Sequence, residues 1–135
     1  MPLEPQPQAL IFFAHGSRNP AWASAMERLL EMVAQRSPAT LTRLAFLETQ
    51  TPSLEACVAE LAGLGLSRLR VVPLFMASSG HLTRDLPALL SSLGQRFPQV
   101  TLELLGPVGE APEVMAAMAA YALGPVARAR DEDQG

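Results

Sequence analysis

The chain has 135 residues, of which 49% are hydrophobic, and a formal net charge of −3 at pH 7. This length suits one domain with a sizeable hydrophobic core. The acidic balance lacks the basic footprint of a nucleic-acid-binding protein, so we expect no nucleic acid among the partners. The single cysteine, Cys57, excludes an internal disulfide and a cysteine-based zinc cluster.

No segment resembles a secretion signal, and none approaches the ~20 apolar residues that a membrane span needs. We therefore expect a cytoplasmic protein with no membrane partner. The Pro- and Gln-rich residues 1–8 are expected to form a disordered N-terminal tail. Residues 9–124 are expected to form a single α/β domain, and residues 125–135 an acidic C-terminal tail.

Strand and helix patterns alternate along the chain. Short apolar runs typical of buried strands occupy residues 9–14, 41–47, 69–75 and 100–105. Apolar residues at helical spacing predict helices over about residues 21–36, 52–62, 85–96 and 113–123. This alternation predicts an α/β fold, a four-stranded parallel sheet of order 2-1-3-4 with helices on both faces.

Local signals refine two of the helix boundaries. Thr51 is a candidate N-cap of the second helix, with Pro52 in its first turn. Residues 76–84 are expected to form a loop, so Asp85 becomes the cap or first-turn acid of the third helix. Cys57 shares helical spacing with Leu54 and Val58, which predicts a thiol packed in the core.

The chain has two histidines, and each follows a predicted strand. His15 follows the first strand and His81 the third. In a 2-1-3-4 sheet these strands are neighbours, and ligands bind beyond their carboxyl ends at the switch point between them. Imidazole is a common metal ligand and titrates near neutral pH, so the pair is a candidate metal or proton-transfer site. The competing interpretation is two unrelated loop histidines.

Other polar residues follow the same strands. Glu48, after the second strand, is a candidate to assist metal binding or to accept a proton; alternatively it is a solvated loop carboxylate. Ser17 and Arg18 precede the first helix, where a hydroxyl and a guanidinium suit an anionic group. A plain helix-capping loop explains them equally well.

The loop before His81 is a candidate ligand contact. Met76 could touch a flat apolar ligand, although a methionine is more often core filler. Ser78, Ser79 and Gly80 suit a flexible backbone lining, and an ordinary glycine-bearing turn is the alternative.

Taken together, these motifs resemble those of the small CbiX-type sirohydrochlorin chelatases. The resemblance rests on three segments, each after a predicted strand: Phe-Ala-His-Gly-Ser-Arg at 13–18, Phe-Leu-Glu at 46–48 with Pro52, and Val-Pro-Leu-Phe at 72–75 with Gly-His at 80–81, Asp85 and Pro87. It spans about residues 9–124.

The resemblance implies one chelatase-like half that works as a homodimer on sirohydrochlorin, a tetrapyrrole. It implies that His15 and His81 bind the metal, that His15 or Glu48 accepts the pyrrole protons, and that residues 76–81, including Ala77, contact the substrate. The divalent metal, Co²⁺ first and Fe²⁺ or Ni²⁺ as alternatives, is then a substrate, and no organic cofactor is expected. The sequence itself does not choose among these metals.

Other functions remain open at this level. The same histidines would serve a metal-binding or tetrapyrrole-carrying protein without catalysis. A silent dimerisation module would bind neither ligand. A phosphotransfer enzyme is disfavoured, because no arginine directly precedes His15 and no second histidine is placed as a phosphate clamp.

Overall fold

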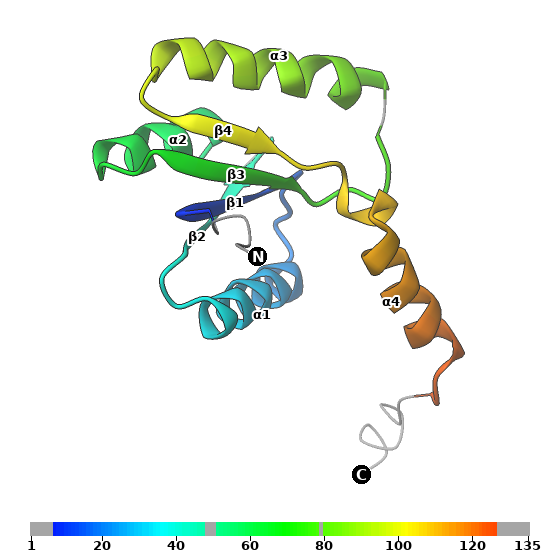
Figure 1. Ribbon diagram of the computed structural model, residues 1–135. Coiled ribbons are helices and arrows are strands. Elements are labelled where there is room, and N and C mark those ends of the chain that lie inside the picture. The colour runs from blue at the N-terminus through cyan, green and yellow to red at the C-terminus, as the bar shows by residue number, and fades with distance from the viewer. Residues whose placement is uncertain (1–6, 48–50, 79, 127–135) are drawn as a thin grey trace, which may run out of the picture.

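The computed structural model describes residues 7–47, 51–78 and 80–126, and within residues 80–84 it describes the backbone alone. Its elements alternate along the chain (Figure 1): β1 (Ala9–Ala14), α1 (Pro20–Arg36), β2 (Leu41–Phe46), α2 (Leu54–Gly63), β3 (Arg68–Pro73), α3 (Gly80–Arg96), β4 (Thr101–Leu104), the short 3₁₀ helix η1 (Val108–Glu110) and α4 (Pro112–Leu123). All strand pairs are parallel, in the order β2-β1-β3-β4. The predicted fold class and strand order are therefore confirmed.

The core lies between one face of the sheet and helices α2 and α3. β1 supplies Ile11 and Phe13 to it, and β3 supplies Leu69 and Val71, all at most 2% exposed. Successive strand residues point to opposite faces, so these alternate positions line a single face. The predicted burial of Cys57 is confirmed, since its side chain is 1% exposed within α2.

Helix α1 covers the opposite face of the sheet (Figure 1). Trp22 of α1 lies against Phe46 of β2, with ring centroids 5.8 Å apart. Helices therefore lie on both faces, as predicted. Pro73, an awkward residue for a strand interior, is the last residue of β3, where it removes one ladder donor at the point where pairing ends.

Two predicted helix starts are wrong. Ser53, rather than Thr51, is the N-cap of α2, and its hydroxyl accepts a hydrogen bond from the Ala56 amide at 3.1 Å. Helix α3 begins at Gly80, so His81 lies in its first turn instead of a loop, and Asp85 lies beyond that turn. Pro87 lies inside the helix. Burial of one face of α3 against the core outweighs these weak local preferences.

The two ends of the described chain differ in how they contact the sheet. Gln8 donates its amide to the Arg68 carbonyl, and its side-chain oxygen accepts from the amides of Ser67 and Arg68. At the other end, α4 leaves the sheet and projects away from it (Figure 1). The described helices are all too short or too polar to span a membrane.

Candidate metal and substrate site

His15 lies directly beyond β1, the strand flanked by β2 and β3. Its side chain is exposed, and its ring is 4.8 Å from that of Phe75, at an interplanar angle of 83°. Phe75 in turn makes an edge contact with Phe13, at 6.1 Å and 79°. A buried aromatic pair thus supports one side of an exposed imidazole.

The backbone after His15 turns sharply. Gly16 has a φ of 103°, a conformation that residues with a Cβ rarely adopt. Asn19 then caps α1, because its side-chain oxygen accepts from the Ala21 amide at 2.9 Å. This turn releases His15 from the strand and leads the chain into the helix within five residues.

The two predicted anion contacts lie in that turn. The Ser17 hydroxyl accepts a hydrogen bond from the Asn19 amide at 3.1 Å, which is a capping arrangement. Arg18 is exposed. The capping interpretation therefore accounts for part of what Ser17 does, while contact of either residue with a substrate remains a prediction.

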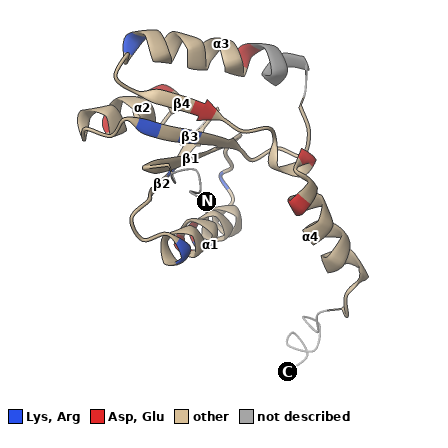
Figure 2. Cartoon of the chain, in the orientation of Figure 1, with Lys and Arg blue, Asp and Glu red and all other residues tan. Residues whose placement is uncertain are grey.

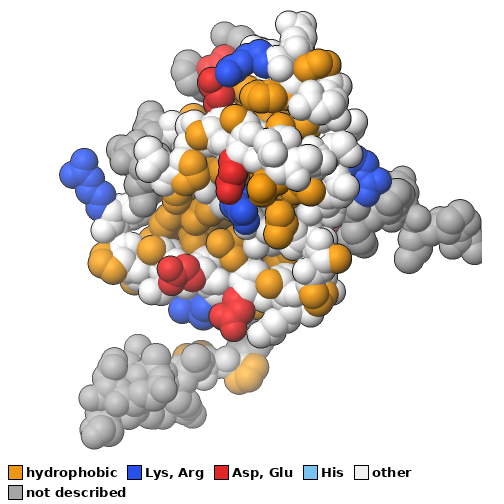
Figure 3. All heavy atoms as spheres, turned by 90° about the vertical axis from the view of Figure 1, so that its left-hand side faces the viewer, with side chains coloured by type: hydrophobic (Ala, Val, Ile, Leu, Met, Phe, Trp, Pro, Cys, Tyr) orange, Lys and Arg blue, Asp and Glu red, His pale blue; other side chains and the backbone are white. Residues whose placement is uncertain are grey.

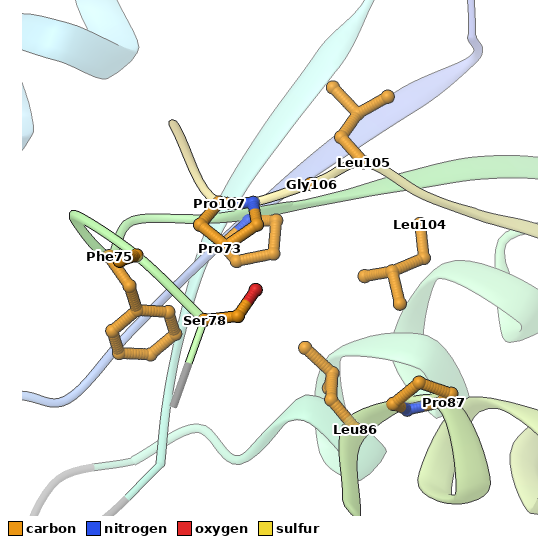
Figure 4. Close-up of a pocket in the computed structure, with 10 residues that line it drawn as sticks. Pro73, Phe75, Ser78, Leu86, Pro87, Leu104, Leu105, Gly106 and Pro107 are labelled. Atoms are coloured by element: carbon orange, nitrogen blue, oxygen red, sulfur yellow. The ribbon is translucent and has the colours of Figure 1, made fainter. Parts of the chain in front are cut away.

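Two hollows border the end of β3. One, of about 200 Å³, lies beside His15 and is lined by Ala14, His15, Gly16, Trp22, Met26 and Leu74. The other, of about 250 Å³, is shown in Figure 4 and is lined by Pro73, Phe75, Ala77, Ser78, Leu86, Pro87, Leu104, Leu105, Gly106 and Pro107. The lining of the second hollow is mostly apolar, as suits the flat face of an organic ligand.

Of residues 76–78, predicted to contact the substrate, Ala77 and Ser78 line this second hollow. Met76 is 66% exposed, so it is not core filler. Ala77 and Ser78 are also exposed, and Ser78 projects toward Pro73 in Figure 4. These three residues are accessible to a ligand bound at the carboxyl ends of the strands.

Four predicted site residues lie where the structure describes no side chain. Glu48 and Ser79 lie outside the described residues, and Gly80 and His81 are described through their backbone alone. The part of the chain that is described holds no group of three His, Cys, Asp or Glu side chains able to bind a metal. The assignments of His81 and Glu48 therefore stay predictions; the backbone of His81 lies in the first turn of α3.

Two aromatic residues beside His15 are not among the predicted site residues. Trp22 packs against Phe46 and also lines the hollow beside His15. Phe75 was placed inside a strand. The usable signal for Phe75 was the parallel pairing of β1 with β3, which puts the residues after Phe13 and after Pro73 at the same edge of the sheet.

Fold and site together define a class: small parallel α/β proteins with an exposed histidine at the switch point of the sheet. The CbiX family model matches residues 9–122. The chain belongs to the CbiX family, as its motifs predicted.

Individual relatives agree with this assignment. The chain is 33% identical over 82 residues to the sirohydrochlorin cobaltochelatase of Methanosarcina acetivorans, across 61% of this chain and 63% of that protein. It thus spans somewhat less than two thirds of that relative. A CbiX protein of Marinobacter aquaeolei VT8 superposes with a TM-score of 0.72 at 32% identity, covering 86% of this chain and 94% of the other.

A longer relative matches through half its length. The sirohydrochlorin chelatase SirB of Bacillus subtilis subspecies spizizenii, in complex with cobalt, superposes with a TM-score of 0.70 at 26% identity. The match covers 87% of this chain but 50% of that one. One copy of this chain is thus equivalent to about half of the longer chelatase.

Proposed function

We propose that this protein is a chelatase that inserts a divalent metal ion into sirohydrochlorin. The observation that carries the proposal is the exposed His15 imidazole at the switch point of the sheet. It lines one hollow and contacts Phe75, which lines the other. Membership of the CbiX family supports the choice of substrate. Co²⁺ is the first metal to test, because the relatives named above include a cobaltochelatase and a chelatase in complex with cobalt.

The proposed reaction needs no redox step. The metal ion, bound by His15 and His81, replaces two protons on the pyrrole nitrogens, and both protons leave to a base and then to water. His15 or Glu48 is that base, since each follows a strand that ends at the same edge. The macrocycle lies against the apolar hollow, and Arg18 is available to its carboxylates.

A spectrophotometric assay of metal insertion tests this function. Purified protein is mixed with sirohydrochlorin and Co²⁺, Fe²⁺ or Ni²⁺, beside a control without enzyme. We expect faster insertion with at least one metal and its loss in His15→Ala and His81→Ala. Glu48→Gln is compared with Glu31→Gln, an exposed α1 carboxylate, which should remain fully active.

The outcomes separate the candidate functions. Multiple turnovers establish a chelatase. Stoichiometric binding of metal or tetrapyrrole without acceleration would instead indicate a carrier, and absence of any binding at micromolar concentrations would indicate a dimerisation module. A fully active His15→Ala variant would overturn the assigned role of this residue.

We further propose that the protein acts as a homodimer in the cytoplasm and that α4 forms the dimer surface. The length match to half of SirB supports pairing. Helix α4 has no buried residue, and its Met115, Met118, Tyr121 and Leu123 are 37–87% exposed. Beside its start lies a hollow of about 550 Å³ that the helix does not fill. A second copy would cover both.

Exposure alone does not identify this surface. Figure 3 shows hydrophobic side chains gathered also on the side facing away from α4. Charged residues of both signs are spread over several of the described elements (Figure 2). The test is the mass in solution of Tyr121→Glu, which should shift from dimer to monomer. Leu64→Glu, at a residue 59% exposed after α2, is the matched control and should stay dimeric.

A further inference from the structure

The 3₁₀ helix η1 forms hydrogen bonds with two residues of the loop that follows β3. The Gly109 amide donates to the Phe75 carbonyl at 3.0 Å. The Ser78 amide donates to Oε2 of Glu110, also at 3.0 Å. Two consecutive residues of η1 therefore anchor the first and last residues of the segment 75–78.

Close packing adds to these two hydrogen bonds. Gly109 is buried, and a Cβ built on it would overlap the carbonyl oxygen and Cα of Met76. Those are backbone atoms, which cannot rotate away as the end of a side chain could. The contact therefore requires glycine for steric reasons, because only a residue without a side chain lets the two backbones approach so closely.

The anchored segment is the one that borders the proposed site. Phe75 makes the edge contact with His15, and residues 77–78 line the apolar hollow. The side chains of residues 76–78 are exposed and do not pack into the core. Phe75 itself is packed in the core against Phe13. The hydrogen bonds and close packing with η1 therefore matter most for residues 76–78, whose side chains make no such core contact.

We infer that Gly109 and Glu110 are positioning residues for the chelatase site: they hold the backbone of residues 75–78 in place beside the apolar hollow. The inference rests on the proposed function for its catalytic consequence. Glu110 acts through the Ser78 amide. It neither binds the metal nor takes a pyrrole proton.

Glu110 provides the cleanest test, because its role requires only an acceptor oxygen. Glu110→Ala removes the acceptor, and we expect the KM for sirohydrochlorin to rise about tenfold, the equivalent of one charge-assisted hydrogen bond. The kcat at saturation should change little. Glu110→Gln retains an acceptor and should recover most of the wild-type KM. A purely structural role in η1 would lower thermal stability without this split between KM and kcat.

Glu31→Ala is the matched control. It removes the same charge from an exposed position of α1, and no described hydrogen bond joins Glu31 to the loop. It should keep the wild-type KM. A Glu110→Ala variant with unchanged KM, or a Glu110→Gln variant as defective as Glu110→Ala, would overturn the inference. Gly109→Ala should show the larger defect if it folds.

Amide hydrogen exchange separates this inference from the proposed function. Whether or not the wild type inserts metal, Glu110→Ala should speed exchange of the Ser78 amide by at least tenfold, while Glu31→Ala leaves it unchanged. An inactive wild type would refute the chelatase proposal alone. Unchanged Ser78 exchange in Glu110→Ala would refute the anchoring alone.

Discussion

The reactivity of the Cys57 thiol can be predicted from its burial. Its side chain is 1% exposed. Burial, with a smaller contribution from the Glu60 carboxylate and opposed by Arg43, raises the pKa of Cys57 from 9.0 to about 11. Below pH 9, such a shift reduces the thiolate fraction about 100-fold relative to the unfolded chain. Because Cys57 is the only cysteine, a thiol reagent reports on it alone.

The assay compares reaction of a disulfide reagent with the folded protein and with the protein in denaturant at pH 8. We expect the folded protein to react at least about 100-fold more slowly, since burial restricts access as well as ionisation. A folded protein reacting within a few-fold of the denatured chain would refute both the burial and the raised pKa.

The same shift predicts how stability depends on pH. The pKa of Cys57 is higher in the folded state, so its contribution is fully present below pH 9 and is lost as pH rises from 9 toward 11. The unfolding free energy should fall by up to about 3 kcal/mol over this range. Urea denaturation of the wild type and of Cys57→Ala isolates the effect, because only the wild type should show this component.

Two further predictions concern the folded framework. Leu61→Ala, at a fully buried position of α2, should lower the unfolding free energy by about 2–5 kcal/mol in urea denaturation; a loss below about 1 kcal/mol would mean that the site is not packed as described. Asn19→Ala removes the N-cap of α1. It should lower the melting temperature through a loss of about 1 kcal/mol in the unfolding free energy. Asn19→Asp retains a capping oxygen and should keep the wild-type melting temperature.

Sequence patterns predicted most of the strands and helices because the spacing of apolar residues indicates which side chains are buried. The apolar run at residues 9–14 matches β1 residue for residue, and a continuous apolar run is expected where both faces of a strand are covered. Alternation of strands and helices then predicted the parallel sheet and its order. The start of α3 was missed because Gly80, a poor helix former, favours the loop that was predicted over residues 76–84.

The candidate site was likewise predictable from the sequence only in part. That His15 follows a strand could be inferred from the sequence alone, and this placed it at the carboxyl ends of the parallel strands. That Phe75 packs against His15, and that η1 anchors the loop bearing Phe75, depends on residues more than thirty positions apart meeting in space. No local pattern encodes such contacts.

The sequence by itself determined the fold class, the strand order, the burial of Cys57 and the position of His15, because periodicity and local breaks report the immediate surroundings of each residue. The tertiary structure alone decided which aromatic ring supports His15, why residue 109 must be glycine and how α4 leaves its apolar surface uncovered. Those features follow from packing between distant segments, whose energy depends on three-dimensional proximity rather than on neighbours along the chain.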